Sequence, residues 1–122
     1  MQRPNDLVDR TKRFGLETIK FCEGLPKDET SRILSRQLLR PATSVGANYR
    51  AVNRAKSKAD FISKLGTVLE EADESAYWIE LLTDAGKVAP SRSGPLHREA
   101  NELVAIAVAS LNTARRNSDP EE

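Results

Sequence analysis

The sequence predicts an all-α protein that folds as an antiparallel, up-down-up-down four-helix bundle. Three observations favour this fold class. The 122 residues are 30% charged and poor in aromatic side chains, and the helix-forming residues Ala, Leu, Glu, Lys and Arg dominate the composition. Apolar residues recur at helical spacing in four segments, and no segment alternates as a strand would. Short connections between these segments place successive helices antiparallel.

Capping residues delimit the first two helices. Asn5 is the predicted N-cap of a helix that ends at Glu23, before a turn at residues 24–26. Its core-facing seam comprises Leu7, Val8, Phe14, Gly15, Phe21 and Cys22. The second helix is predicted from Asp28 to Ala55. Its core-facing arc comprises Leu34, Leu38, Ala42, Val45, Tyr49 and Val52.

Ser57, followed three residues later by Asp60, has the form of a capping box and predicts a third helix directly after the second. This helix is expected to reach Ala85 and to stop at Gly86. Its core-facing arc comprises Phe61, Leu65, Val68, Leu69, Ala72, Ala76 and Ile79. At about 27 residues, or roughly 40 Å, each, helices two and three are expected to form a long central hairpin.

The segment KVAPSRSGP, residues 87–95, is predicted to be a loop, because it contains two prolines and a glycine. It leads to a fourth helix predicted from Leu96 to Arg116. Residues 1–116 are thus expected to form a single bundle domain, and residues 117–122 a frayed tail.

The formal net charge of +1 hides a segregation of charge along the chain. From Thr30 to Lys64 there are eight basic residues and one acid, Asp60. From Glu70 to Asp84 there are six acids and no base. The second helix is therefore basic and the third is acidic.

The stretch QLLRPATSVGANYR, residues 37–50, gives the second helix three faces. Opposite the core arc lies an arginine stripe that comprises Arg36, Arg40, Arg50 and Arg54. One flank is small or polar and comprises Gln37, Pro41, Ser44, Asn48 and Ala51. Pro41 lacks an N–H and should bend the helix. Two compatible interpretations follow: Ser44 and Asn48 satisfy local backbone groups at the bend, or Asn48 bonds a neighbouring helix or subunit.

Tyr77, Trp78 and Leu81 do not fit the core arc of the third helix. They would form an exposed apolar patch in a single chain, and Tyr and Trp are enriched at the centres of interfaces. We therefore expect the subunit interface to comprise Pro41, Ser44, Asn48, Tyr77, Trp78 and Leu81. Cover by loops of the same chain is the alternative.

Several classes of chemistry find no support in the sequence. There is no membrane-length apolar run and no N-terminal signal sequence, so we expect a cytoplasmic protein. Cys22 is the only cysteine and is interpreted as a core residue. His97 is the only histidine, and with Glu99 and Glu102 nearby it is typical of a surface residue. No nucleotide-binding or nucleophile motif is present, so we expect no enzymatic activity, cofactor, metal or small-molecule substrate.

QLLRPATSVGANYR, the S-x-x-x-F of Ser57 to Phe61 and EEADESAYWIELL at 70–82 together resemble the bacterial four-helix-bundle proteins named after intervening sequences of 23S ribosomal RNA. This resemblance covers most of the chain. It implies small antiparallel bundles that assemble as rings of five. Related accessory proteins of diversity-generating retroelements bind nucleic acid and a reverse transcriptase. The residues that match the family motif are Arg40, Ser44, Asn48, Glu74 and Trp78, and Ala51 stands where the pattern has an acid.

Two hypotheses for the function follow. The first is a homo-oligomeric scaffold, a pentamer by resemblance, that holds a protein partner. The second is binding of RNA or DNA, in which the arginine stripe, repeated around a ring, contacts phosphates without reading sequence. The basic face has no aromatic platform for bases.

Overall fold

The computed structural model describes residues 4–117 and contains four helices. These are α1 (Pro4–Glu23), α2 (Glu29–Val52), α3 (Lys58–Asp84) and α4 (Pro90–Arg116). Within the described residues there is no strand. The predicted tail, residues 117–122, lies outside this range except for Asn117, the C-cap of α4.

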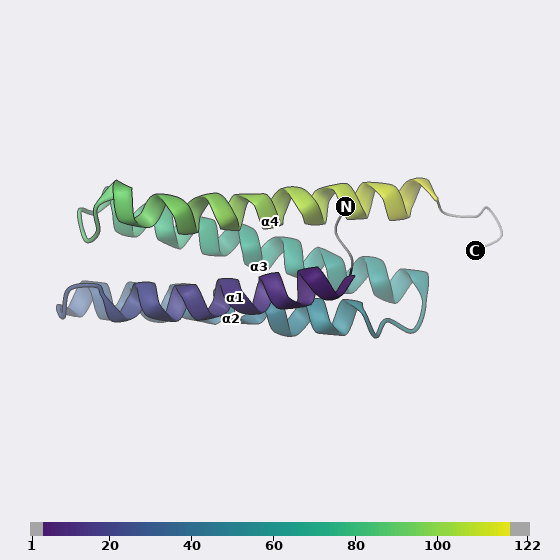
Figure 1. Ribbon diagram of the computed structural model, residues 1–122, viewed down its shortest axis with the longest axis horizontal. Coiled ribbons are helices and arrows are strands. Elements are labelled where there is room, and N and C mark those ends of the chain that lie inside the picture. Colours follow the sequence, from purple (N-terminus) through teal and green to yellow (C-terminus); the bar gives the residue numbers. More distant parts are fainter. Residues whose placement is uncertain (1–3, 118–122) are drawn as a thin grey trace.

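The helices run alternately up and down in a single bundle (Figure 1). α2 packs on α1 and α3, and α3 packs on α4, whereas α1 and α4 pack only sparsely. In the described part of the chain, no Cα atom of α1 comes within 8 Å of α3, and the same holds for α2 and α4. The predicted fold class is therefore confirmed, with α1 and α3 at diagonal corners of the bundle.

Two predicted helix starts are borne out by their caps. Asp28 caps α2 by accepting a hydrogen bond from the Ser31 N–H, and the Ser57 side chain caps α3 by accepting one from the Asp60 N–H. The predicted stop of α3 is also confirmed, because Gly86 adopts a φ of 78°, which ends the helix as a left-handed residue.

The other helix limits need correction. α1 begins at Pro4, before the predicted N-cap Asn5, since proline is favoured at the first helical position. α2 ends at Val52 and not at Ala55, because the chain tightens into i→i−3 bonds and must become extended at Ser57.

The prediction of a loop at residues 87–95 was wrong, because α4 begins at Pro90. Proline fits the first turn of a helix, so Pro90 starts α4 instead of breaking it. Pro95 then lies inside the helix, where a tertiary contact helps to hold the first turns: Ser93 is buried, and its Oγ accepts a hydrogen bond from Thr83 Oγ1 at 2.8 Å. α4 is therefore as long as α3, at 27 residues.

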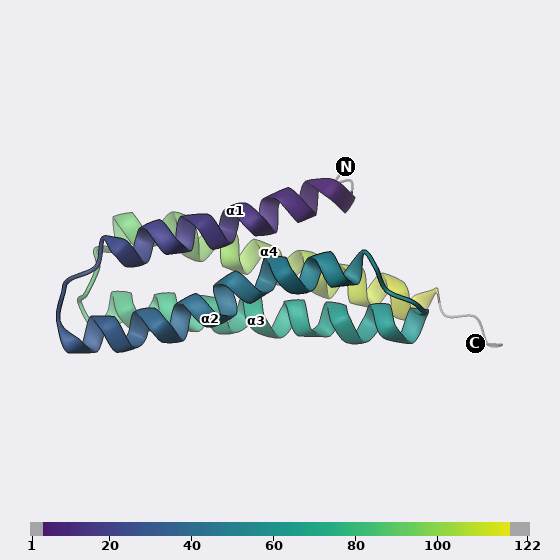
Figure 2. The same cartoon turned by 90° about the horizontal axis from the view of Figure 1, so that it is seen from below.

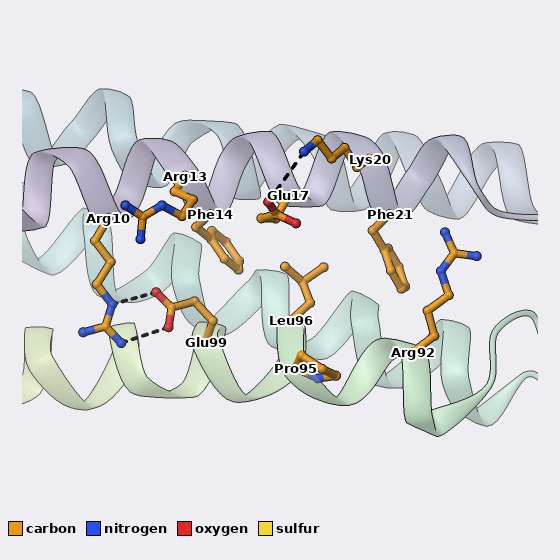
Figure 3. Close-up of a pocket in the computed structure, with 10 residues that line it drawn as sticks. All are labelled: Arg10, Arg13, Phe14, Glu17, Lys20, Phe21, Arg92, Pro95, Leu96 and Glu99. Carbon is orange, nitrogen blue, oxygen red and sulfur yellow. Dashed lines mark hydrogen bonds and ion pairs between the residues drawn. The ribbon is translucent and has the colours of Figure 1, made fainter.

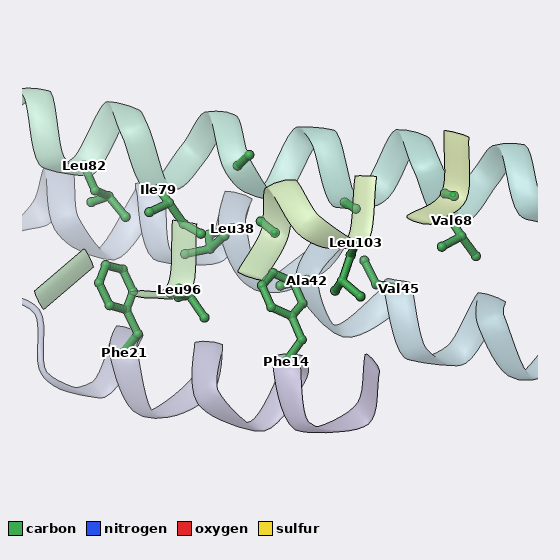
Figure 4. Close-up of a cluster of buried hydrophobic side chains, with 14 of the residues drawn as sticks. Phe14, Phe21, Leu38, Ala42, Val45, Val68, Ile79, Leu82, Leu96 and Leu103 are labelled. Atoms are coloured by element: carbon green, nitrogen blue, oxygen red, sulfur yellow. The ribbon is translucent and has the colours of Figure 1, made fainter. Parts of the chain in front are cut away.

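The core runs the length of the bundle and draws on all four helices (Figure 4). Its labelled members are Phe14, Phe21, Leu38, Ala42, Val45, Val68, Ile79, Leu82, Leu96 and Leu103. Each fully buried large apolar side chain contributes about 1.5–3 kcal/mol relative to an exposed one. Most predicted core residues are buried. The predicted core residues that are only half-buried are Leu7, Val8, Cys22, Leu34, Tyr49, Phe61 and Leu69. The last five of these pack against the core at its edge.

α2 bends near its middle, as Figure 2 shows. Pro41 lies in this part of the 24-residue helix and is buried. A proline inside a helix removes one backbone bond and pushes the chain away from its ring, so the bend has the predicted cause.

Candidate interaction surfaces

The arginine stripe is exposed along α2. Arg36, Arg40, Arg50 and Arg54 are all exposed to solvent. Within residues 4–117, no ion pair or side-chain hydrogen bond engages Arg36, Arg50 or Arg54. These three guanidinium groups are therefore available to an anionic partner.

Arg40 differs from the other arginines because its charge acts on Glu71 of α3. Burial raises the pKa of Glu71, and the nearby Glu74 and Glu70 carboxylates raise it further, whereas Arg40 opposes the shift. The Arg40 charge thus reaches one acid of α3, Glu71.

A groove of about 650 Å³ runs between α1 and α2. Its lining includes Leu16 and Ile19, which are 51% and 38% exposed. Thr43, Gly46 and Ala47 also line it, together with Lys12, Arg50, Arg54 and one acid, Asp9. We call this surface the α1–α2 groove. It combines exposed apolar side chains with three cations. The sequence did not predict this groove, because its residues come from two different helices.

Gly46 lets the two helices that form this groove come close together. A Cβ atom at Gly46 would lie 3.3 Å from the Thr11 carbonyl oxygen and 3.4 Å from the Lys12 nitrogen. Gly15 on α1 lies against Ala42 and Thr43, and a Cβ atom added there would lie 3.7 Å from the Ala42 oxygen. Gly46 in the stretch of small residues on α2 therefore serves packing within the chain.

The small flank of α2 also has local roles. Asn48 Nδ2 donates a hydrogen bond to the Ser44 carbonyl oxygen at 2.9 Å, so the local interpretation is observed for the Asn48 side chain. Both side chains are half-buried. Pro41 is buried within its own chain, so its ring adds little surface to the predicted subunit interface.

Tyr77, Trp78 and Leu81 lie on α3 as predicted, and we call them the aromatic face. Tyr77 is 53% exposed, whereas Trp78 and Leu81 are half-buried. The Tyr77 and Trp78 rings meet edge to face, with centroids 5.0 Å apart and an interplanar angle of 72°. Trp78 Nε1 donates a hydrogen bond to Glu74 Oε2 at 3.1 Å. Trp78 also packs against the core, so it supports both the fold and the surface.

A second groove, of about 440 Å³, lies between α1 and α4 (Figure 3). The rings of Phe14 and Phe21 and the side chain of Leu96 point into it. Arg10 Nε and Nη2 donate to Glu99 at 2.7 and 2.9 Å, and Nη2 also contacts Glu102. The hydrogen bonds to Glu99 are the main reason that the pKa of Arg10 is raised.

The arginine at the other end of this groove is Arg92. Its guanidinium lies 5.9 Å from the Phe21 ring centroid, and Nη1 donates to the Gly24 oxygen at 3.1 Å. The α1–α4 groove was absent from the sequence interpretation. The sequence feature that could have predicted this groove is the antiparallel arrangement of the first and last helices. This arrangement places residues near 10 beside residues near 99.

The remaining polar candidates form ordinary structural contacts. His97 Nε2 lies 2.7 Å from Glu80 Oε2, while Glu99 and Glu102 bind Arg10. No group of three potential metal ligands occurs among residues 4–117. Burial raises the pKa of the Cys22 thiol. None of the four described helices is long and apolar enough to span a membrane.

Comparison with known proteins identifies relatives of the whole bundle. The family model described as 23S rRNA-intervening sequence protein matches residues 3–109. A crystal structure of a protein of unknown function from the S23 ribosomal protein family of Bacteroides thetaiotaomicron is 30% identical, with a TM-score of 0.80. The similarity covers 86% of this chain and 97% of that one. The search of curated proteins found no match. With nearly its whole bundle matched by the family model, the chain belongs to the 23S rRNA-intervening sequence protein family.

Proposed function

We propose that this protein is a non-enzymatic, homo-oligomeric scaffold of the cytoplasm, in which another copy covers the aromatic face of α3. The observation that carries this proposal is the exposure of Tyr77, at 53%, beside the half-buried Trp78 and Leu81. Residues three and four apart share one helix surface, so the three side chains form one patch. Aromatic rings supply large apolar area and are favoured at the centres of interfaces.

The expected assembly is a ring of five subunits, on the basis of the family resemblance. The match of the family model to residues 3–109 supports carrying this expectation to the chain. Ser44 and Asn48 are half-buried on α2, and they complete the proposed subunit contact.

Light scattering across a range of concentrations tests the scaffold. We expect a mass several times the 13.5 kDa of one chain. Tyr77→Ala should weaken assembly at least tenfold, whereas Val108→Ala, which truncates a 40% exposed residue on α4, should not. Trp78→Ala should lower the stability of the oligomer but leave most of the helicity intact. Circular dichroism measures the helicity. A wild-type protein that stays monomeric at all concentrations would remove the proposal.

Backbone-directed binding of RNA or DNA is a second candidate function. It is favoured by the exposure of Arg36, Arg50 and Arg54 and by their lack of ion pairs within residues 4–117. Repetition of these charges around an oligomer would concentrate positive potential on one surface. Such binding falls steeply with salt because phosphate contacts release counterions.

Titration of RNA and of DNA at two salt concentrations tests this second function. Replacing Arg36, Arg50 and Arg54 with Gln should weaken binding similarly for all sequences and reduce its salt dependence. Lys20→Gln, an exposed change on α1, is the control. Affinity that is unchanged in the triple variant would remove the arginine stripe from the function.

The resemblance to retroelement accessory proteins gives an alternative, in which the scaffold holds a reverse transcriptase together with nucleic acid. Copurification of the tagged protein with a reverse transcriptase from its native cells distinguishes this role. The scaffold acting alone predicts recovery of the homo-oligomer without such an enzyme.

A further inference from the structure

We infer that the aromatic face of α3 in one copy docks into the α1–α2 groove of the next copy, in a head-to-tail contact. This inference rests on the proposed oligomerisation and names the surface of the neighbouring copy that receives the aromatic face. The two surfaces carry opposite charge and lie on different helices. Both differences favour contact between unlike surfaces of two copies.

The charge around the aromatic face disfavours pairing of this face with itself. Glu70, Asp73 and Glu74 are exposed on the same helix, and no base lies between Glu70 and Asp84. The Arg40 charge from α2 acts on Glu71, and the His97 ring from α4 contacts Glu80. Neither of these contacts involves Glu70, Asp73 or Glu74. Two aromatic faces in contact would therefore bring carboxylates against carboxylates, which repel each other.

The α1–α2 groove has the complementary properties. Lys12, Arg50 and Arg54 outnumber its one acid, Asp9. Leu16 and Ile19 expose apolar surface that would be covered by an aromatic side chain from another copy. The groove volume of about 650 Å³ falls within the range of sites that enclose whole ligands, so it accommodates a tyrosine ring.

The small residues on one wall of the groove permit a close approach. Thr43 and Ala47 line this wall, are exposed and carry no long side chains. A helix of another copy can therefore lie near the backbone of α2, with its aromatic residues beside Leu16 and Ile19 and its acids near the rim cations.

The position of the two surfaces makes the contact heterologous. The aromatic face is on α3, and the groove is walled by α1, which is the helix diagonal to α3. One copy therefore cannot fill its own groove, and each copy uses one surface toward each of two neighbours. Contacts of this type close into rings or extend as filaments. Docking in the groove would also cover Arg50 and Arg54, which line it. Arg36 lies outside the groove and would stay exposed.

Complementation between two variants tests the head-to-tail contact. Leu16→Asp damages the groove and keeps the aromatic face, whereas Tyr77→Ala damages the face and keeps the groove. Both replaced side chains are more than half exposed, so the bundle should fold, which circular dichroism checks. Each variant alone should run as a single chain in light scattering. An equimolar mixture should form a species of two chains and nothing larger, because one intact contact remains.

The control is Ile33→Asp, which places the same charge at a 45% exposed residue of α2 outside the groove and should leave the wild-type mass unchanged. A mixture that stays monomeric, or a Leu16→Asp protein with the wild-type mass, would overturn the inference while the scaffold still stands. A monomeric wild type would instead overturn the scaffold itself. If Arg54→Glu abolishes RNA binding and leaves the mass unchanged, the groove is a nucleic-acid surface and the docking is wrong.

Discussion

The Arg10 guanidinium forms a two-point ion pair with the Glu99 carboxylate and ties α1 to α4 between residues 89 positions apart in the chain. The side chains are 20% and 29% exposed, so water screens this pair less than it screens a fully exposed pair. It bridges the two adjacent helices that pack most sparsely.

We therefore predict that Arg10→Ala lowers the free energy of unfolding by about 1–2 kcal/mol, because Glu99 loses its charged partner. Amide hydrogens of α1 should exchange faster with solvent than those of α3. Urea unfolding and hydrogen exchange measure the two effects. Lys20→Ala is the control, since Lys20 lies 3.9 Å from Glu17 on the same exposed helix face. Equal stability of the two variants would contradict a structural role for the Arg10 pair.

Two glycines inside helices should respond oppositely to alanine. Gly66 on α3 has no atom within 4 Å of the position of an added Cβ, so Gly66→Ala should stabilise the protein by about 0.5–1 kcal/mol through helix propensity. At Gly46 the added Cβ would lie 3.3 Å from the backbone oxygen of Thr11. This close contact can be relieved only if the α1 backbone moves away.

Gly46→Ala should therefore be less stable than Gly66→Ala by about 1 kcal/mol or more, since overpacking offsets the gain in propensity. Thermal and urea unfolding of the two variants give the comparison. A stability gain at Gly46 as large as that at Gly66 would show that α1 and α2 are not closely packed there.

The fold was predictable from helical periodicity and capping residues, because these act locally. Ser57 and Gly86 set the limits of α3 through their own backbone conformations. The start of α4 was not predictable in this way. Pro90 and Pro95 are breakers by propensity, but packing of Ser93 and Leu96 against the bundle outweighs that preference.

The candidate surfaces also differ in whether the sequence could predict them. The arginine stripe and the aromatic face each belong to one helix, so helical spacing was sufficient to find them. The α1–α2 groove joins Leu16 and Ile19 to Arg50 and Arg54, and its assembly depends on how closely two helices approach. Burial of Pro41 likewise depends on the packing of the whole bundle rather than on its position in α2.

Ser57→Ala should destabilise the protein by about 1 kcal/mol, because the Asp60 N–H loses the Ser57 Oγ acceptor at 3.0 Å. Asp60 reinforces this turn by accepting a hydrogen bond from the Lys56 N–H at 3.0 Å. Ser57→Asp, which retains an acceptor near the helix N-terminus, should keep most of the stability. Chemical denaturation compares the variants. A loss of the same size in both would assign the effect to something other than capping.

Glu71 should make stability depend on pH. Burial, reinforced by Glu74 and Glu70, raises its pKa above the ordinary value of 4.5. The folded state then binds the proton more tightly than the unfolded state, so this contribution favours folding below pH 4.5 and is lost as the pH rises through the folded pKa. At neutral pH the charged Glu71 is a net cost, despite the favourable charge of Arg40.

Glu71→Gln should therefore raise the stability at neutral pH, and the difference from wild type should shrink as the medium is acidified below pH 4.5. Arg40→Gln should raise the pKa of Glu71 further, because the opposing cation is removed. Urea unfolding from acidic to neutral pH measures the first effect, and NMR titration of the Glu71 carboxyl measures the second. Asp73→Asn, an exposed change on the same helix at an acid that does not shift the pKa of Glu71, controls for the loss of one negative charge. A Glu71→Gln variant that is less stable than wild type at neutral pH would mean that Arg40 outweighs burial and repulsion at this carboxylate.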